Sequence, residues 1–576
     1  MLTRDAFPVF ALALVVVAVA LCIPLHVYPL SNYIEELWVA LGVIGCSAWL
    51  FWRGGVFRFS VLTAMWLVLG CIFFFSAFFH ESTFFSGKAF YIVFWFLGFL
   101  SLLISDQVDW SSDQASTALA WIVFSSALVC AVGGFFRHYG WLWDGAAAFV
   151  PQVNTGRMVG LVGHSNFFAF ICLIGMCGGA WLFNRGRVRL WLLALSGFLF
   201  IYGVVLSGSR AALLAWCVLL ICVWVRRRKL QSDRLVRALA VSAFAFLIVQ
   251  PLAGYVDDFL SGFASGLSQV DGRLFEFGGR GVGSSGRLDE WNITLDVFLD
   301  HPLTGVGIGN YASAGFEKHI ALGVPSPGGL FSHSHNLILQ MAAELGLVGL
   351  VWLMAFLALC AKGVWEGLAD IRRVLPVSVL LVFFVYSQFE FPYWIMHFLV
   401  LNLLLTGAVG GKHFSFEVKL GKFFSAILVF LFLSVSAIYV PLAERFYWSF
   451  KQYLQRAPVE VGEYSFMNSM IADPLLEPYG YLIYVANFQV SPKSLEREIT
   501  VLRRFRDYRP YAPVLVRLAI LEVAAGNTEN GRRVINDARI FYGSASIDTH
   551  VLSQLEEAER AFPDVDFTLL RPSKAG

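Results

Sequence analysis

Two histidines and an asparagine stand where a polar segment gives way to an apolar one. The segment reads FSHSHNLILQMAAELGLVG over residues 331–349, and it contains His333, His335 and Asn336 near its start. An imidazole titrates near neutral pH, so a histidine at this boundary is suited to proton transfer. A metal site is the alternative, but the i, i+2 spacing is not that of a helical zinc pair, and no cysteine or third histidine is near. The pattern therefore favours proton transfer over metal binding.

One arginine stands where a phosphate could be held, and a second begins a predicted helix. Arg210 lies in the turn LSGSRAA between two apolar stretches, and Arg287 begins RLDEWNITLDVFLDHPLTGVGIGNY. A guanidinium presents five N–H donors in a planar fork that suits phosphate oxygens, and we expect Arg210 to have an anionic partner. The alternative for Arg210 is a side chain that reaches lipid headgroups. After Arg287 the spacing predicts an amphipathic helix with an apolar face of Leu288, Trp291, Leu295 and Phe298.

Polar residues also interrupt the apolar sequence at two other places. GRMVGLVGHSN contains Arg157, His164 and Asn166, and SQFEFPYW contains Glu390. A carboxylate in an apolar stretch is costly unless it pairs, so we expect a partner for Glu390, with arginine the plausible one. The alternatives are a loop in which Ser165 or Asn166 caps a helix, and a surface turn in which Pro392 ends one.

Two sequence patterns suggest cofactor or metal sites that we do not expect. GVGSSG at 281–286 fits GxGxxG, but no predicted strand precedes it and no βαβ unit fits, so a flexible lid or turn is the better interpretation. The nine cysteines lie in apolar runs without a CxxC motif, which argues against a disulfide framework or a zinc site. We therefore predict neither a cofactor nor a metal.

The composition indicates an integral membrane protein. Of 576 residues, 58% are hydrophobic and 14% charged, and the mean hydropathy is +0.68; soluble chains are about 25% charged. The net charge of +2 gives no reason to expect a nucleic-acid surface. We predict an all-α bundle of about thirteen transmembrane helices, near 7–28, 36–52, 60–79, 89–105, 117–136, 166–183, 190–206, 211–225, 236–254, 337–361, 375–389, 394–410 and 423–441.

Orientation follows from the short loops, because lysine and arginine are retained in the cytoplasm. Most of these residues fall in one set of alternate loops, whereas the opposite set holds only Lys88, Arg137, Arg157 and Arg210. This predicts a cytoplasmic N-terminus, with all the polar clusters above at the outer face. Four segments are expected: an N-terminal bundle (1–254), a large outer loop (255–336), further membrane helices (337–441) and a soluble outer helical domain (442–576). Within the last, 511–525 and 528–541 predict a tetratricopeptide-like hairpin.

The order of these motifs resembles a known family. The pattern HN-x9-G-x-x-G, from His335 and Asn336 to Gly346 and Gly349, is similar to the signature of the O-antigen ligase and polymerase superfamily of membrane glycosyltransferases. With the RLDEWN…GVGIGNY block before it and SQFEFPYWIMHF after it, the chain looks like the PglL-type O-oligosaccharyltransferases of Gram-negative bacteria. The resemblance covers roughly residues 150–410, and the hydrophilic helical tail is also similar.

The resemblance implies a bacterial inner-membrane enzyme that moves an oligosaccharide from undecaprenyl diphosphate to Ser or Thr of a periplasmic protein such as pilin. It implies that His335 is the base and that Arg210 and Arg287 bind the diphosphate. Further donor-binding candidates are Arg157, His164, Asn166, His333, Asn336 and Glu390. Related enzymes often carry Gln where this chain has His164.

Two other functions are considered. An enzyme of the same superfamily would transfer the glycan to lipid A core or to another glycan; the charged tail argues for a protein acceptor instead. A polyprenyl-lipid or sugar transporter would often show internal repeats or broken helices in matching halves, and the sequence shows none.

Overall fold

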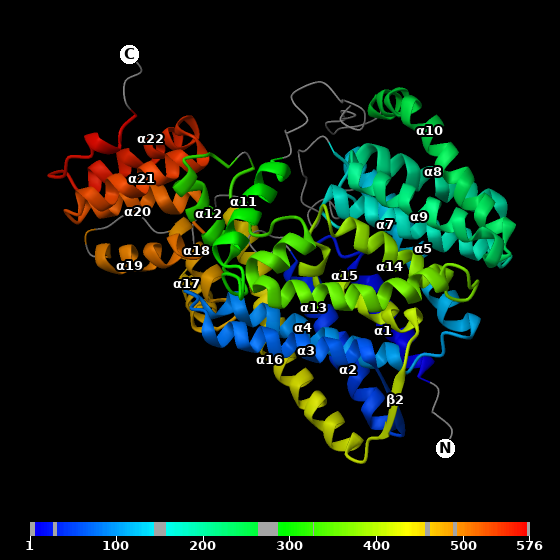
Figure 1. Cartoon of the computed structure of the whole chain (residues 1–576). Coiled ribbons are helices and arrows are strands. Elements are labelled where there is room, and N and C mark those ends of the chain that lie inside the picture. The colour runs from blue at the N-terminus through cyan, green and yellow to red at the C-terminus, as the bar shows by residue number, and fades with distance from the viewer. Residues whose placement is uncertain are drawn as a thin grey trace. The chain divides into compact units, whose positions relative to one another are not determined.

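The computed structural model describes residues 6–26, 32–142, 157–262, 286–326, 328–454, 461–487, 492 and 494–572. These residues form helices and one short two-stranded ribbon (Figure 1). They fall into two compact units. Unit 1 comprises Met1–Val68, Phe94–Phe277 and Met354–Lys451, and unit 2 comprises Leu69–Val93, Gly278–Leu353 and Gln452–Gly576.

Unit 1 is built from apolar helices. They are α1 (Phe7–Ala20), α2 (Tyr33–Arg53), α5 (Asp113–His138), α7 (Ser165–Asn184), α8 (Leu190–Ser207), α9 (Arg210–Leu230), α10 (Asp233–Ser261), α14 (Val374–Tyr386), η2 (Pro392–Trp394), α15 (Met396–Leu405) and η3 (Thr406–Val409). Four of the five boundaries between the units fall within α3 (Val61–Phe79), α4 (Phe85–Asp106), α13 (Leu337–Gly367) and α16 (Gly421–Leu454), and the fifth lies outside the described residues.

A helix occupies each of the thirteen ranges predicted from hydropathy, so the polytopic all-α class is confirmed. Within the described residues, nine helices are long and apolar enough to cross a membrane. Three more are apolar but shorter, namely Phe7–Ala20, Val374–Tyr386 and Met396–Val409. The remaining helix, α9, has 21 residues and ends in a basic run. The count of thirteen crossings stays a prediction.

Close packing around α7 organises unit 1, because α7 carries Asn166 in its first turn. An added Cβ at Gly175 would lie 2.3 Å from the Cβ of Ala127, and one at Gly178 would lie 2.8 Å from the carbonyl oxygen of Ala120. Small residues let membrane helices approach closely. The glycines therefore seat α7 directly against α5, and almost the whole of α7 is buried.

A two-stranded ribbon was not predicted. Strand β1 (Val56–Ser60) pairs antiparallel with β2 (His413–Glu417), with Arg58 opposite Ser415. The Oδ2 of Asp106 accepts hydrogen bonds from the backbone nitrogen of Ser60 at 2.8 Å and from Oγ1 of Thr63 at 2.6 Å. Five-residue strands are too short for their alternation to stand out from the apolar helices beside them.

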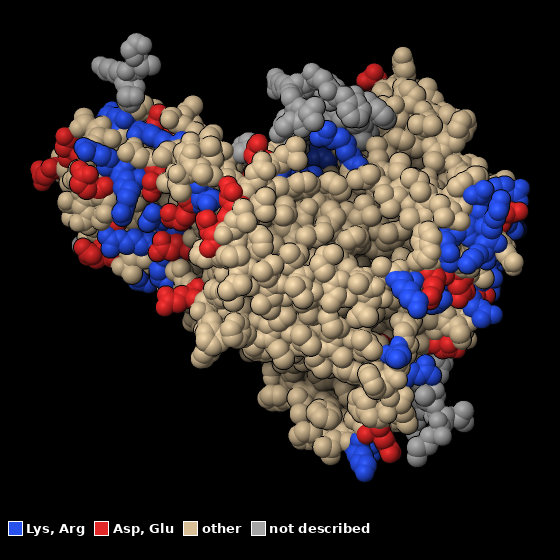
Figure 2. All heavy atoms as spheres, viewed as in Figure 1, with Lys and Arg blue, Asp and Glu red and all other residues tan. Residues whose placement is uncertain are grey.

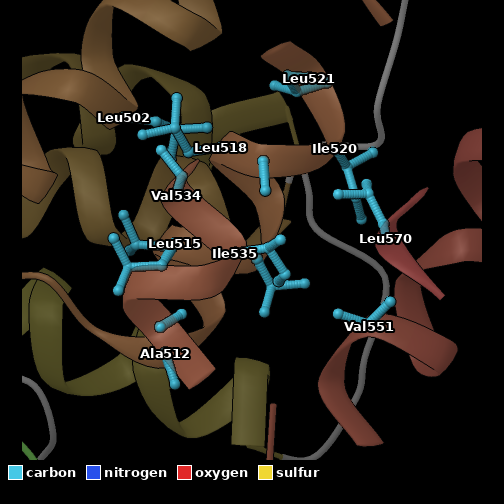
Figure 3. Packing of buried hydrophobic residues seen from close by; sticks show 14 of the residues in the cluster. Leu502, Ala512, Leu515, Leu518, Ile520, Leu521, Val534, Ile535, Val551 and Leu570 are labelled. Atoms are coloured by element: carbon cyan, nitrogen blue, oxygen red, sulfur yellow. The ribbon is translucent and has the colours of Figure 1, made fainter. Parts of the chain in front are cut away.

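Unit 2 holds the remaining helices. They are α11 (Arg287–Asp300), α12 (Tyr311–Leu322), α17 (Val461–Ala472), α18 (Glu477–Asn487), α19 (Leu495–Arg506), α20 (Ala512–Ala524), α21 (Thr528–Tyr542), α22 (Ser544–Ala561) and η4 (Thr568–Leu570). The predicted hairpin is present as α20 and α21, and Gly526 between them has φ +84°, which favours glycine. Leu515, Leu518, Val534 and Ile535 form its buried core (Figure 3).

Candidate functional site

Two of the predicted polar clusters meet in unit 1. The Nη2 of Arg157 donates a hydrogen bond to Oδ1 of Asn166 at 3.0 Å, and Nδ2 of Asn166 donates to Oε1 of Glu390. The Nε of Arg157 also donates to the carbonyl oxygen of Ser207 at 2.7 Å. Ser207 is the last residue of α8 and belongs to the LSGSRAA turn. Arg157, Asn166 and Glu390 therefore form one connected group, called here the unit 1 polar cluster.

The geometry of this cluster decides between the alternatives left open by the sequence. Glu390 is only 1% exposed, so SQFEFPYW is not a surface turn. Glu390 accepts a hydrogen bond from the amide of Asn166, and the same amide accepts one from Arg157. The expected arginine is therefore connected to Glu390 through Asn166. Helix α7 begins at Ser165 after His164, and no side chain caps it. The capping interpretation of Asn166 is therefore wrong, because its amide joins a cation to a carboxylate.

Tyr386 ties the cluster to the LSGSRAA turn, a role that sequence reasoning missed. Its hydroxyl donates to the carbonyl oxygen of Asn166 and lies 3.3 Å from Oγ of Ser209. That Oγ accepts from the backbone nitrogen of Ala212 at 3.4 Å and so caps α9. A tyrosine in the apolar run of α14 carries no distinct signal, because aromatic residues are common in membrane helices.

Arg210 is the first residue of α9 and its side chain is exposed. Among the residues that the structure describes, it forms no ion pair with an aspartate or glutamate. The anionic partner expected from the sequence is thus not an acidic side chain of the described chain. The positive N-terminal end of α9 adds to the attraction of this position for an anion.

A second buried pair holds the loop that leads into α7. The Nε2 of His26 lies 2.8 Å from the carbonyl oxygen of Leu161, and Nδ1 lies 2.9 Å from Oε1 of Glu35, which is fully buried. The Nη1 of Arg137 donates to the carbonyl oxygen of Gly160 at 3.0 Å. Sequence reasoning missed this pair, although a glutamate near the start of an apolar helix was a usable signal.

His164, a donor-binding candidate, packs between aromatic rings. Its ring centroid lies 4.5 Å from that of Phe167 and 6.1 Å from that of Phe391. The side chain is half-buried at the entrance of α7. His164 is thus close in sequence to Asn166 of the unit 1 polar cluster, but its ring contacts are with Phe167 and Phe391.

In unit 2 the first signature glycine, Gly346, breaks helix α13. Gly346 has φ +61° and ψ −152°, which is not helical. The loop between α11 and α12 supplies hydrogen bonds at the break: the backbone nitrogen of Val306 donates to Ala343 O at 2.9 Å, and that of Leu347 donates to Pro302 O at 2.8 Å. The GVGIGNY and HN-x9-G-x-x-G motifs therefore interlock through their backbones.

Glycine is required at this contact. An added Cβ at Gly346 would lie 2.4 Å from the carbonyl carbon of Leu303, and one at Gly305 would lie 2.3 Å from that of Glu344. The Oε1 of Glu344 accepts from the backbone nitrogen of Gly309 at 3.0 Å. The spacing of the glycines thus reflects close approach of two backbones.

The HSHN turn is held rigidly in front of α13. Asn336 caps the helix, since its Oδ1 accepts from the backbone nitrogen of Leu339 at 3.0 Å. The backbone nitrogen of Ser334 donates to Oε1 of Gln340 at 2.7 Å. Between them His335 takes φ +55°, a value uncommon for a residue other than glycine. The half-buried imidazole packs edge-on to the ring of Phe331.

Helix α11 brings Arg287 to the same part of unit 2. Arg287 is its first residue, and one turn later Nε1 of Trp291 donates to the carbonyl oxygen of Ser334 at 3.0 Å. The start of α11 is thereby attached to the residue that precedes His335. The group of Arg287, His333, His335 and Asn336 is called the unit 2 polar cluster.

The predicted apolar face of α11 is wrong in part, because only Trp291 and Phe298 of its four residues are half-buried. Its buried residues are Glu290, Ile293, Thr294 and Val297, whereas Leu288 and Leu295 are 54% and 44% exposed. Tyr311 explains the rotation of the helix. Its hydroxyl donates to Oε1 of Glu290 at 2.5 Å, and burial together with the Glu290 charge raises the pKa of Tyr311 well above its ordinary value. A buried hydroxyl needs this acceptor.

His333 is the other histidine of the unit 2 polar cluster. Burial, followed by the charges of Arg509 and His335, lowers the pKa of His333 well below its ordinary value. Its Nδ1 lies 2.9 Å from Oγ of Ser332. His333 is therefore neutral at neutral pH.

The GVGSSG stretch lies outside the described residues except for Gly286. The described part of the chain contains no His/Cys/Asp/Glu group that could hold a metal ion.

Two family models match the chain: O-Antigen ligase over residues 195–354, and the C-terminal part of the virulence factor membrane-bound polymerase over residues 374–556. The chain belongs to the O-antigen ligase and polymerase superfamily. The first match contains Arg210 and the unit 2 polar cluster, and the second contains Glu390 and the helical hairpin. No curated protein matches the chain.

The superfamily assigns a general role. Its members are membrane enzymes of the ligase and polymerase kind, so this protein is a membrane protein with a glycosyl-transfer function. Arg157, His164 and Asn166 precede both matched ranges, so their place in the site rests on the structure of unit 1.

Proposed function

We propose that this protein is an O-oligosaccharyltransferase that moves a glycan from undecaprenyl diphosphate to Ser or Thr hydroxyls of a periplasmic protein such as a pilin. The observation that carries the proposal is His335, half-buried in a turn anchored by Ser334, Asn336 and Trp291. A fixed imidazole is suited to accept a proton from a hydroxyl, which is a weak nucleophile.

In the proposed reaction, His335 takes the proton of the acceptor hydroxyl as the oxygen attacks the anomeric carbon of the first sugar. The bond from that carbon to the diphosphate breaks, and the electron pair leaves with the lipid diphosphate. Arg210 and Arg287 stabilise the charge that develops on the diphosphate. This chemistry needs no metal.

The remaining candidates are proposed to bind the donor. Arg157, Asn166 and Glu390 are already connected, so they present a preorganised polar surface. His164 offers an aromatic and polar edge, and neutral His333 can donate or accept a hydrogen bond. Asn336, which caps α13 through its Oδ1, completes the proposed donor-binding set. Donor and acceptor would meet at the periplasmic side of the inner membrane, with the N-terminus in the cytoplasm and the C-terminal domain in the periplasm.

A second candidate is transfer of the glycan to lipid A core or to another glycan. The descriptions of both matching families favour it. The soluble helices α19–α22 favour the protein acceptor instead, because helical hairpins offer a surface for a polypeptide. A transporter remains the alternative from another class, and the family matches argue against it.

Intact-mass analysis separates these functions. Pilin and lipopolysaccharide would be compared from cells with the gene, without it, and with only the His335→Ala variant. The proposal predicts a glycan mass on pilin that is lost in the last two strains, with unchanged lipopolysaccharide. A change confined to lipopolysaccharide would support the ligase function, and unchanged masses on both would reject transfer to either acceptor.

A further inference from the structure

An apolar cavity opens between helices α7, α8 and α10 of unit 1. Its volume is about 580 Å³, within the range of about 300–1,000 Å³ usual for small-molecule sites. Most of its lining is apolar and includes Met176, Phe183, Leu193, Phe198 and Val249. The unit 1 polar cluster contributes nothing to this lining, so the cavity is separate from the proposed transfer site.

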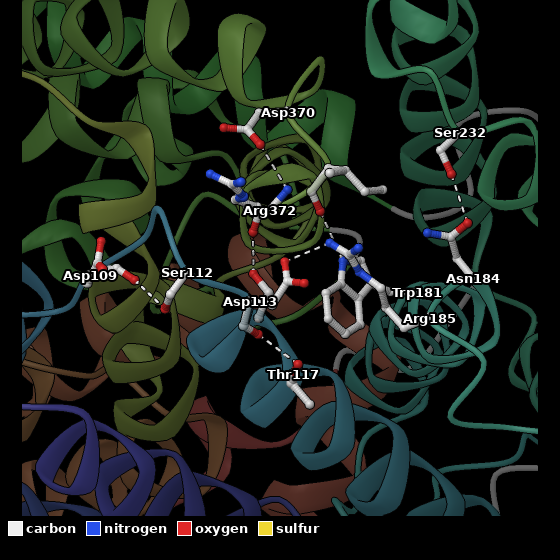
Figure 4. Close-up of polar contacts among 12 residues, drawn as sticks. Asp109, Ser112, Asp113, Thr117, Trp181, Asn184, Arg185, Ser232, Asp370 and Arg372 are labelled. Carbon is white, nitrogen blue, oxygen red and sulfur yellow. Dashed lines mark hydrogen bonds and ion pairs between the residues drawn. The ribbon is translucent and has the colours of Figure 1, made fainter.

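Two arginines line the cavity at the start of α10. The guanidinium of Arg234 stacks on the ring of Phe183 at 4.0 Å, and Nε of Arg237 donates to the carbonyl oxygen of Asp233 at 3.2 Å. A hydrogen bond of 2.8 Å from Oγ of Ser232 to Oδ1 of Asn184 ties the start of α10 to the end of α7 (Figure 4). The two guanidinium groups are thereby held at the end of the apolar lining.

The charges of these arginines have no acidic partner in the described part of the chain. Arg185 provides the contrast: its Nη2 lies 2.6 Å from Oδ1 of Asp113 and its guanidinium stacks on Trp181 (Figure 4). Figure 2 shows basic side chains gathered where α8, α9 and α10 lie. Both guanidinium groups are exposed and are therefore available to an anion.

We propose that this cavity binds an anionic phospholipid, with the acyl chain against the apolar lining and the phosphate on Arg234 and Arg237. An amphiphile satisfies both halves of the site, whereas a small anion would leave the apolar lining uncovered. Basic pockets between membrane helices commonly bind anionic headgroups. Binding of a lipid in this cavity does not depend on which acceptor the enzyme uses.

Two variants address the two halves of the site. The double variant Arg234→Ala/Arg237→Ala removes the headgroup contacts. Gly197→Phe fills the apolar half: Gly197 lines the cavity, and a Cβ added there would meet no atom within 4 Å, so the substitution introduces no backbone clash. Matched controls are Arg227→Ala/Arg228→Ala on α9 and Gly254→Phe on α10, none of which lines the cavity.

Native mass spectrometry of the full-length protein, delipidated in detergent, measures binding of phosphatidylglycerol, phosphatidylcholine with the same chains, and inorganic phosphate. We expect phosphatidylglycerol to bind most tightly. The double arginine variant should weaken it about 30-fold, since each basic residue near an anionic headgroup contributes about 1 kcal/mol. Gly197→Phe should also abolish tight binding, and both controls should bind as the wild type does.

Other results would overturn the proposal. Equal binding of the two lipids would remove the charge argument, and phosphatidylglycerol binding that survives Gly197→Phe would show that no chain enters the cavity. Inorganic phosphate that competes with the lipid at equal concentration would identify a small-anion site instead. Loss of binding in the control variants as well would indicate a general effect of charge or bulk.

Discussion

The two polar clusters of this protein are built by different means. In unit 1, Arg157, Asn166 and Glu390 are joined side chain to side chain, and Tyr386 adds a hydroxyl to the same group. In unit 2, the backbone conformation places His335. His335 itself has a left-handed conformation, the next residue, Asn336, caps α13, and Gly346 breaks that helix. One cluster rests on charge and amide pairing, and the other on conformations and close approaches that few residues permit.

This difference predicts how each cluster responds to mutation. A side-chain network should fail by losing hydrogen bonds and leaving buried groups unsatisfied, at a cost of about 1–3 kcal/mol for each group. The backbone contact at the α13 break should be disrupted by steric clash and strain, even when the new side chain is a single methyl group.

Replacement of His335 should have the largest effect on activity. His335→Ala removes the proposed base and should lower transfer about 10²–10⁴-fold, the usual contribution of a general base. Transfer would be measured in cells that supply the lipid-linked donor, with the amount of variant in the membrane as the reference. Exposed His301→Ala is the matched control and should keep full activity. Full transfer by His335→Ala would remove the proposed base.

Gly346→Ala tests the backbone contact at the α13 break. The new Cβ would lie 2.4 Å from the carbonyl carbon of Leu303, and its φ of +61° is unfavourable for alanine. Strain and overpacking together should cost about 2–6 kcal/mol, measured as a lower thermal unfolding midpoint in detergent with reduced transfer. Gly197→Ala in unit 1, where an added Cβ meets nothing within 4 Å, should leave the midpoint unchanged or raised. Similar midpoints for both variants would contradict the account of the α13 break.

Arg210→Ala separates binding from stability. The exposed side chain forms no ion pair among the described residues, so its loss should leave thermal unfolding unchanged. If it holds a diphosphate oxygen, kcat/KM for the lipid-linked donor should fall about 10–100-fold, the range for a hydrogen bond to a charged group. Exposed Arg228→Ala should not change it. An unaltered kcat/KM in Arg210→Ala would exclude a donor contact.

Asn166→Ala tests the side-chain network of unit 1. Loss of the amide takes a hydrogen bond from buried Glu390 and another from Arg157. We expect a loss of about 1–3 kcal/mol in the free energy of unfolding, together with weaker donor use. Asn166→Asp, which adds a carboxylate beside Glu390, should be the worse of the two. If Asp were tolerated as well as Asn, the pairing with Glu390 would not matter.

The smallest expected effect concerns pH. His333 has a folded-state pKa below its unfolded value of about 6.5, so the unfolded chain binds the proton more readily. Its contribution to stability is present above about pH 6.5 and is lost as the pH falls from there towards the folded pKa. His333→Asn should therefore flatten the fall of the unfolding midpoint between pH 7.5 and pH 5.5, values of about 1 unit on either side of the unfolded pKa. An identical pH profile for the variant would be evidence against a neutral His333.

Several elements of the fold were predictable because their signals are local. Apolar length located all thirteen apolar helices, and amphipathic spacing located α20 and α21. The face of α11 was not predictable, because it depends on Tyr311, 21 residues from Glu290, whose hydroxyl needs a buried acceptor. The pair of His26 and Glu35 joins residues of no known motif and was missed for the same reason.

The sequence by itself determined that this is a polytopic helical membrane protein, which residues are polar within it, and the superfamily to which it belongs, because chain length, hydropathy and motif spacing are properties of consecutive residues. Only the tertiary structure decided what those polar residues do to one another: that Asn166 joins Arg157 to Glu390, that Asn336 is a helix cap, and that the signature glycines let two backbones touch. Hydrogen bonds and close approaches depend on distance in space, and residues far apart in the chain, such as Asn166 and Glu390, become neighbours only when the helices pack.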